Sequence, residues 1–285
     1  MKVAIVGNFG FIGSHLAKNW NTDNDKLYLF NSINLFKNGL NRLNDDILKC
    51  DLIIWTAGKV NPSSGEHNNL IIEEELANWN IVLDAFSEVE NYTDKRFIFL
   101  SSGGCTYTAT CLPYFENDQA LGTNQYGKMK LRQEHSLSKI FPNNVIIRLS
   151  NIYGPGQSIG KGQGVIAEWA AAIRNGEILK MYGDQDSFRD YLHVFDAVSA
   201  IEIISKDKIR GVINVGSGEP TTLGQLKEYF LTYAGRDIDF DILGGRITDR
   251  NGYYLSIQKI TDIIGWTPTI PMSEGINKLI NSGLT

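Results

Sequence analysis

The strongest indication of the fold comes from the residues Lys2-Val-Ala-Ile-Val-Gly7-Asn-Phe-Gly10-Phe-Ile-Gly13. Its first five residues form a short apolar run that stops at Gly7, which is typical of a buried parallel strand. After Gly10 the pattern is helical as far as Trp20. A strand, three spaced glycines and a helix together predict a tight turn in which the backbone can approach a ligand closely.

The GxxGxxG spacing of these glycines predicts a site for a dinucleotide. The helix after the turn would direct its first amide N–H groups and a partial positive charge at a pyrophosphate. We therefore expect NAD or NADP here, against the alternative of a tight turn without a ligand. The predicted contact residues in the turn are Gly7, Phe9, Gly10, Phe11, Ile12 and Gly13.

Strand-like and helical stretches alternate over the first half of the chain. This alternation predicts an α/β fold with a Rossmann-type, doubly wound parallel sheet. Right-handed crossovers place the loops after the strands on one edge, where they meet the glycine turn. The predicted strands are Lys2–Val6, Lys26–Phe30, Asp51–Trp55, Arg96–Leu100 and Val145–Leu149. The cofactor contacts expected from their loops are Asn31, Ala57, Gly58, Lys59 and Ser101.

The composition of the sequence changes after Tyr153, where glycine-rich stretches begin. We predict an NAD(P)-binding domain from 1–155 plus about 184–214. A smaller, partly interleaved substrate lobe would comprise about 156–183 and 215–285.

Asn31 follows the second strand, where a carboxylate normally holds the adenosine ribose. An asparagine does not repel a 2′-phosphate, and Lys37 or Arg42 would be near enough to reach one. The choice between NAD and NADP is therefore open. The segment from Asn31 to Asp51 is also short, with little room for the usual third strand, so the adenine end should be abbreviated.

Tyr126 and Lys130 form a YxxxK pair on a predicted helix over 124–139. A tyrosine pKa near 10 is too high for a good base at neutral pH. A lysine one helical turn away lies on the same face, and its charge favours the phenolate. The pair therefore predicts proton transfer coupled to hydride transfer, with an ordinary amphipathic helix as the alternative. We count both residues as catalytic and as cofactor contacts.

Four later segments resemble the extended short-chain dehydrogenase/reductase family, especially its NAD-dependent nucleotide-sugar epimerase/dehydratase group, which includes UDP-glucose 4-epimerase. Their order is the family's, and the resemblance covers nearly the whole chain. They are Ile147–Gln157 (R-x-x-N-x-Y-G-P), Phe188–Asp196 (R-D-Y-[IL]-x-V-x-D), Asn214–Gly218 (N-[IV]-G-S-G) and Ile263–Pro268 (L-G-W-x-P).

The resemblance implies a Ser or Thr hydroxyl donor in the turn Ser101-Ser-Gly-Gly-Cys-Thr-Tyr107, but the matching position holds Gly103. Ser102 is our first candidate for the donor, Thr106 the second and Cys105 the third. A second departure is Glu75, which stands near the family's asparagine on the long helix.

The resemblance also implies a nucleoside-diphosphate sugar as substrate. Asn151 and Arg189 would face the diphosphate, and Arg246 and Asp249 would hold phosphate and ribose hydroxyls. Arginine suits bidentate phosphate contacts, and aspartate suits vicinal hydroxyls. For Arg189, an ion pair with its neighbour Asp190 is the structural alternative.

Three functions follow from these patterns. The leading one is an NAD(P)-dependent 4-epimerase of a nucleoside-diphosphate hexose, in which Tyr126 takes the 4-hydroxyl proton and a 4-keto sugar forms and is reduced again. The second is an NAD(P)H-dependent reductase of a nucleotide-linked 4-keto-6-deoxy sugar. The third is a non-catalytic dinucleotide-sensing protein, although such proteins typically lack the Tyr/Lys pair.

Composition narrows the partners of the chain. The net charge is −5, with 27 basic and 32 acidic residues and no basic stripe, so we expect neither nucleic acid nor a membrane. Three cysteines without ligand spacing and four scattered histidines predict no metal site and a cytoplasmic protein. By analogy with the family, we expect a homodimer that pairs through helices around 70–88 and 124–139.

Overall fold

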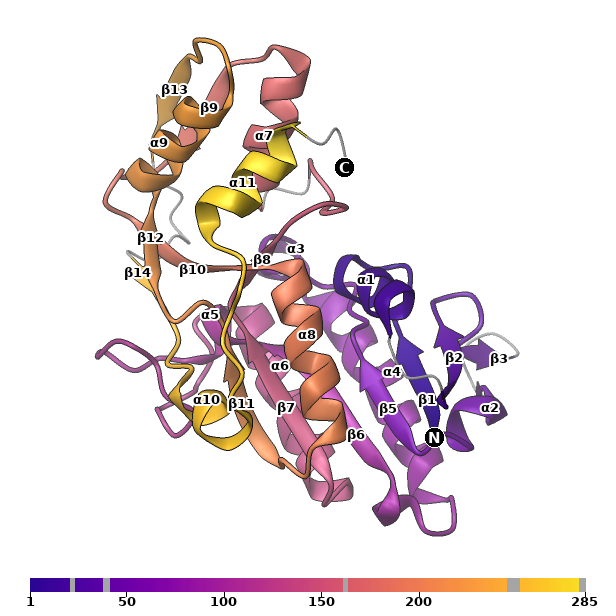
Figure 1. Cartoon of the computed structure of the whole chain (residues 1–285). Helices are drawn as coiled ribbons and strands as arrows, with labels where there is room; N and C mark the ends of the chain where they lie inside the picture. Colours follow the sequence, from indigo (N-terminus) through magenta and orange to yellow (C-terminus); the bar gives the residue numbers. More distant parts are fainter. Residues whose placement is uncertain (21–23, 38–41, 161–163, 245–251, 282–285) are drawn as a thin grey trace.

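A six-stranded parallel sheet forms the centre of the larger part of the molecule (Figure 1). The computed structural model describes residues 1–20, 24–37, 42–160, 164–244 and 252–281. The strand order is β11-β7-β6-β5-β1-β2, with every neighbouring pair parallel, which confirms the predicted Rossmann-type fold. The strands are β1 (Lys2–Val6), β2 (Lys26–Phe30), β5 (Leu52–Trp55), β6 (Arg96–Ser102), β7 (Asn144–Leu149) and β11 (Gly211–Val215).

Helices cover both faces of this sheet. On one face lie α1 (Phe11–Asn19) and α8 (Val194–Lys206), and on the other α4 (Asn69–Ser87) and α6 (Gln125–Ile140). Side chains of a strand alternate between the faces, so Val3 and Ile5 pack with α1 and α8, while Ala4 and Val6 pack with α4 and α6. Burial on both faces explains why the strands are continuous apolar runs.

The sheet ends at β2 on the side where a Rossmann fold usually has a third strand. In the described part of residues 31–51, no further strand joins the sheet. The chain there forms only the short hairpin β3 (Phe36–Lys37) with β4 (Arg42–Leu43), followed by α2 (Asp45–Leu48). The described residues of this segment agree with the expected shortening of this end.

A second, smaller core lies apart from the sheet, at the top of Figure 1. Trp169 and Phe230 pack edge to face at its centre. Strands β9 and β13 pair in parallel beside them. The elements of this core are α7 (Val165–Asn175), β9 (Leu179–Tyr182), α9 (Leu223–Tyr233), β13 (Phe240–Leu243) and α11 (Met272–Asn281).

Short strands connect the two cores. Strand β10 (Phe188–His193) pairs with β8 (Asn151–Tyr153), β12 (Pro220–Thr222) and β14 (Gly252–Tyr253). The predicted domain boundaries at 155, 184 and 214 stay a prediction. The remaining elements are α3 (Pro62–His67), the 3₁₀ turn Tyr92–Asp94, α5 (Gly103–Thr106) and α10 (Gln258–Ile264).

Candidate active site

The turn between β1 and α1 is built too tightly for side chains. Gly7 has a left-handed backbone, with φ of +96°. A Cβ on Gly13 would collide with the Gly7 carbonyl and lie 2.5 Å from the Thr56 hydroxyl. The turn is closed by a 2.8 Å hydrogen bond from the Gly10 N–H to the Gly7 carbonyl. Backbone amides at the start of a nine-residue helix are thereby left open, which fits a dinucleotide pyrophosphate.

At the adenine end, the Asn31 side chain forms one hydrogen bond within its own loop. Its side-chain oxygen accepts the Ile33 N–H at 2.9 Å, while its amide nitrogen lies 3.5 Å from the side-chain oxygen of Asn8. The amide therefore faces the glycine turn and can donate to a ribose hydroxyl.

The two cations that were expected near a 2′-phosphate are paired with an acid. Lys37 and Arg42 lie 2.9 and 3.2 Å from the Asp45 carboxylate. Hydrogen bonding to Lys37, together with the nearby charges, lowers the pKa of Asp45, so the carboxylate is charged and neutralises part of this cluster. The structure thus gives NADP no unopposed cation at these two positions.

The loop after β5 contacts the long helix α4. The Lys59 N–H donates to Glu75 at 3.0 Å, and the Lys59 ammonium pairs with Glu74 at 3.1 Å. A Cβ on Gly58 would lie 3.7 Å from the Glu75 carboxylate and 3.9 Å from the Lys130 ammonium. Glu75, whose consequence the sequence did not reveal, thus sits at the same spot as the lysine of the YxxxK pair.

Tyr126 and Lys130 lie in the first two turns of α6, directed at the carboxyl edge of the sheet. The Asn124 side chain caps this helix by accepting the Gly127 N–H at 2.8 Å. The Lys130 ammonium donates to the Leu100 carbonyl at 3.2 Å and lies 4.7 Å from the Phe99 ring centroid and 5.8 Å from that of Tyr126. The lysine ammonium is therefore close to the tyrosine ring and also to Gly58.

Burial shifts both groups away from their charged forms. It raises the pKa of the Tyr126 hydroxyl above its ordinary value, with further contributions from Cys105 and Glu75. It lowers the pKa of Lys130 to about 8, although Glu75 and Glu134 oppose the shift. The lysine is therefore charged below pH 8. Formation of the phenolate depends on positive charge close to Tyr126.

Below this pair lies a buried ion pair that the sequence reading missed. Arg148 on β7 binds Glu134 through two contacts of 2.7 and 3.2 Å, and both side chains are 6% exposed. Ser101 donates a short hydrogen bond to the same carboxylate. Glu134 follows Lys130 by one helical turn, and that spacing was the available signal. The network fixes β6 and β7 against α6 under the site.

The side chains of the candidate hydroxyl donors in the turn after β6 point in different directions. The Thr106 hydroxyl is buried and donates to the Ser102 carbonyl. Ser101 points at α6, and Ser102 still has extended backbone, so strand alternation places the Ser102 side chain on the opposite face of the sheet. The catalytic roles of Ser102 and Thr106 stay predictions.

The predicted substrate contacts are only partly described. The Asn151 amide donates to the Asp190 carbonyl at 3.3 Å, and the Arg189 guanidinium lies 6.0 Å from the Tyr253 ring centroid. Asp190 is fully buried and accepts from the Ser217 backbone, the Ser217 hydroxyl and the Leu255 backbone. It therefore anchors two loops around Arg189. Arg246 and Asp249 lie outside the described residues.

The described ranges of the chain lack two further features. They contain no helix of the length and hydropathy needed to cross a membrane. They also contain no group of three or more His, Cys, Asp or Glu side chains placed to hold a metal ion.

Comparisons with known proteins give the same family throughout. An Escherichia coli protein named dTDP-4-dehydro-6-deoxyglucose reductase is 32% identical over 66% of this chain, and the match spans 61% of its own length. A Methanocaldococcus jannaschii protein named putative UDP-glucose 4-epimerase is 26% identical over 98% of this chain and 97% of its own. The structure of Thermus thermophilus UDP-glucose 4-epimerase in complex with NAD superposes with a TM-score of 0.86 at 22% identity, covering 99% of this chain and 98% of that one.

The family model described as "NAD dependent epimerase/dehydratase family" matches residues 3–216, from the first strand to the last strand of the central sheet. The matched range includes the glycine turn, the Tyr126/Lys130 pair and the buried network beneath it. The chain therefore belongs to the NAD-dependent epimerase/dehydratase family of enzymes.

Proposed function

We propose that this enzyme is an NAD(P)-dependent nucleotide-sugar 4-epimerase acting on a nucleoside-diphosphate hexose through a 4-keto intermediate. The observation that carries the proposal is the meeting of Lys130, Tyr126 and the loop after β5 at the carboxyl edge of the sheet. It is supported by the nearly full-length similarity to the archaeal protein named putative UDP-glucose 4-epimerase.

The proposed chemistry assigns one task to each described residue. A bound nicotinamide supplies a hydride acceptor and a positive charge. Tyr126 holds the proton that leaves the sugar 4-hydroxyl and returns it when the 4-keto sugar is reduced on its other face. Lys130, charged below pH 8, favours the phenolate form of Tyr126. Glycines 7, 10 and 13 would hold the pyrophosphate.

The diphosphate of the substrate would lie along β8 and β10. Asn151 and Arg189 stand there beside the buried Asp190 anchor. A guanidinium can bind two phosphate oxygens at once, so Arg189 would contribute most of this affinity. Arg246 and Asp249 complete the proposed substrate set.

A reductase of a nucleotide-linked 4-keto-6-deoxy sugar is the second candidate. Two observations favour it: the 32% identical relative carries a reductase name, and the adenine end lacks a third strand in the described residues. An epimerase recycles one cofactor molecule in place, whereas a reductase must exchange it at each turnover. A short adenine end suits exchange.

The nucleotide released from freshly purified, denatured protein distinguishes the two candidates. We expect stoichiometric NAD, identified by chromatography and mass, together with interconversion of UDP-glucose and UDP-galactose without added cofactor. Protein that releases no dinucleotide and consumes NADH or NADPH with dTDP-4-dehydro-6-deoxyglucose would replace the epimerase by the reductase.

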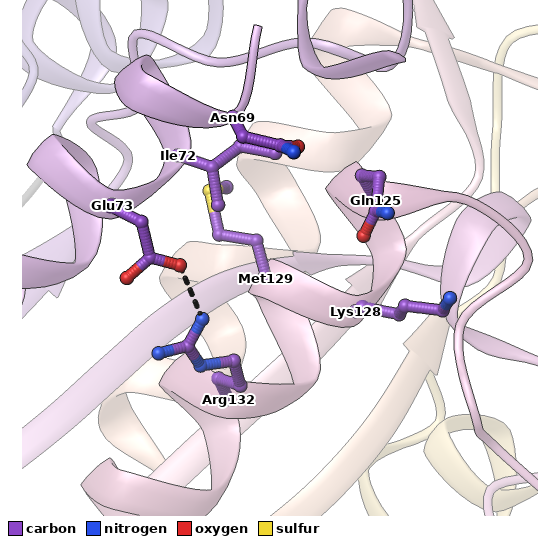
Figure 2. Close-up of a pocket in the computed structure, with 7 residues that line it drawn as sticks. All are labelled: Asn69, Ile72, Glu73, Gln125, Lys128, Met129 and Arg132. Carbon is purple, nitrogen blue, oxygen red and sulfur yellow. Dashed lines mark hydrogen bonds and ion pairs between the residues drawn. The ribbon is translucent and has the colours of Figure 1, made fainter.

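We also propose a homodimer that pairs through α4 and α6. On their outer faces the two helices carry opposite charges, with Glu73 and Asp84 on α4 and Lys128 and Arg132 on α6. A groove of about 370 Å³ lies between them, and Figure 2 shows the Glu73–Arg132 ion pair of 2.9 Å at its rim. In a two-fold dimer, α4 of one copy would face the complementary α6 of the other.

Light scattering during size-exclusion chromatography tests this interface. We expect a dimer for the native chain and a monomer for Arg132→Glu, with the exposed Arg210→Glu as a charge-matched control that remains dimeric. A native monomer at micromolar concentration would refute the dimer. We further propose a cytoplasmic location, because the described chain has three free cysteines, one of them exposed.

A further inference from the structure

The turn after β6 lacks side chains because another part of the chain occupies their space. A Cβ on Gly103 would lie 2.7 Å from Leu255 Cδ1. A Cβ on Gly104 would collide with the Tyr253 hydroxyl and lie 2.7 Å from Tyr253 Cε1. Gly103 therefore leaves room for the Leu255 side chain, and Gly104 leaves room for Tyr253. The Tyr253 oxygen thus lies beside Gly104, the residue that follows the position where a Ser or Thr hydroxyl was expected.

Tyr253 is held firmly in this position. It lies in β14, paired with Arg189 of β10, and is 6% exposed. Gly252 before it has no room for a Cβ because the Phe188 ring lies there, 2.5 Å away at Cδ1. Two residues further on, the Leu255 N–H donates to the buried Asp190 carboxylate at 3.1 Å. The tyrosine is thus fixed by strand pairing on one side and a buried anchor on the other.

The Tyr253 hydroxyl and Tyr126 are both close to Cys105. The thiol of Cys105 is an electrostatic neighbour of both tyrosines. Gly127, directly after Tyr126, packs against the Cys105 carbonyl so closely that no Cβ would fit. The turn Gly103–Thr106 therefore touches the start of α6 on one side and Tyr253 on the other.

The Tyr253 hydroxyl is suited to donate. Burial raises its pKa well above the ordinary value, so it keeps its proton at neutral pH. No hydrogen bond joins this hydroxyl to another described residue. Its competitors are less well placed, since Thr106 donates to its own turn and the Ser102 side chain alternates away from α6.

We propose that Tyr253 supplies the hydroxyl donor to the reacting sugar oxygen, opposite Tyr126, in place of the Ser or Thr that Gly103 replaces. This proposal rests on the proposed nucleotide-sugar function. Tyr253 donates a hydrogen bond to the oxygen at C4 and keeps its own proton, while Tyr126 takes and returns the proton that is transferred. No bond of Tyr253 breaks.

The test compares single-hydroxyl variants of the full chain. The probes are UDP-glucose, UDP-galactose and dTDP-4-dehydro-6-deoxyglucose, the last with NADH and NADPH. Tyr253→Phe keeps the ring and its packing, and we expect kcat to fall about 10²- to 10³-fold, as for removal of one oxyanion donor, with KM and Tm little changed. Tyr254→Phe, at the neighbouring residue, is the matched control and should keep the native kcat.

A second variant distinguishes loss of the hydroxyl donor from a change in packing around Tyr253. Gly104→Ala places a methyl group where the Tyr253 hydroxyl lies, so it should lower kcat by itself. In the double variant with Tyr253→Phe, we expect no further loss of kcat, because both changes remove the same interaction.

The outcomes separate this proposal from the function on which it rests. If Tyr126→Phe abolishes turnover while Tyr253→Phe keeps kcat within about twofold of native, Tyr253 is not the donor. Loss of kcat in Ser102→Ala with an active Tyr253→Phe would assign the role to Ser102. A native chain inactive on all three probes would overturn the proposed function, and Tyr253 as donor with it.

Discussion

The two ends of the dinucleotide site are built in different ways. At the nicotinamide end, Lys130 is 5% exposed and lies above the buried Glu134–Arg148 pair. At the adenine end, β2 is the edge of the sheet, and the Lys37, Arg42 and Asp45 side chains that follow it are 41–67% exposed. The first end is fixed by contacts between distant segments, and the second by local turns.

The two ends should differ in how well they tolerate substitutions. Buried charges need partners with good geometry, so the nicotinamide end tolerates little change. Exposed ion pairs contribute little to stability because water screens them, so the adenine end can vary without loss of the fold. Substitutions at the nicotinamide end should therefore lower the catalytic rate. Substitutions at the adenine end should change the preference between NAD and NADP.

Tyr126→Phe should cause the largest effect and confine it to the nicotinamide end. Removal of the proton-transfer hydroxyl should lower kcat about 10²- to 10⁴-fold, while dinucleotide binding is kept. Steady-state rates and nucleotide release from the denatured variant measure the two properties. Native turnover in this variant would remove Tyr126 from the mechanism.

Gly13→Ala should damage the turn that joins the two ends. Alanine is the better helix former by roughly 0.5–1 kcal/mol, but its Cβ would strike the Gly7 carbonyl, a backbone atom. We expect dinucleotide affinity to fall by about tenfold or more, measured by NADH fluorescence titration. Gly224→Ala in α9, where the nearest atom would be 3.5 Å away, is the matched control. Unchanged affinity in Gly13→Ala would argue against the turn as the cradle.

The fall of kcat/KM at alkaline pH should reflect the deprotonation of Lys130. The depressed pKa means that the ammonium is charged below about pH 8 and is lost as the pH rises through that value. We expect kcat/KM to fall about tenfold per pH unit above it. Glu75→Gln removes a carboxylate that raises this pKa, so the break should move to lower pH. A break that stays in place would show that another group controls it.

Asn31→Asp should produce the smallest effect, at the adenine end alone. A carboxylate could still accept the Ile33 N–H but would repel a 2′-phosphate. For a group near solvent, we expect NADP affinity to fall by about 1 kcal/mol, or about fivefold, with NAD affinity unchanged or improved. Binding titrations with both cofactors measure the ratio, and an equal change for the two would place Asn31 away from the ribose.

Local patterns in the sequence predicted much of the scaffold. The strands Lys2–Val6 and Lys26–Phe30 have the expected bounds, and the described residues of the segment from 31 to 51 add no third strand, as the shortness of that segment predicted. Each of these features depends on neighbouring residues or on chain length.

The site was harder to predict because its parts come from distant segments. The sequence placed Tyr126 and Lys130 by their helical spacing, but it could not show that Tyr253 fills the space above Gly104, because about 150 residues separate them. The Arg148–Glu134 pair was missed for a related reason, since it joins a strand to a helix. Glu75 was noticed only as a departure, and its nearness to Lys130 required the fold.

The path of the chain between the two cores has a consequence for cooperativity. The chain leaves the sheet after β7, returns through β10 and α8 to complete it with β11, leaves again, and returns to pack α10 against the same sheet. Neither core is a continuous segment, and the chain crosses several times between them, so we expect their stabilities to be coupled. Chemical denaturation should therefore unfold both in one transition, and a destabilising change in the smaller core should lower the stability of the cofactor-binding sheet as well.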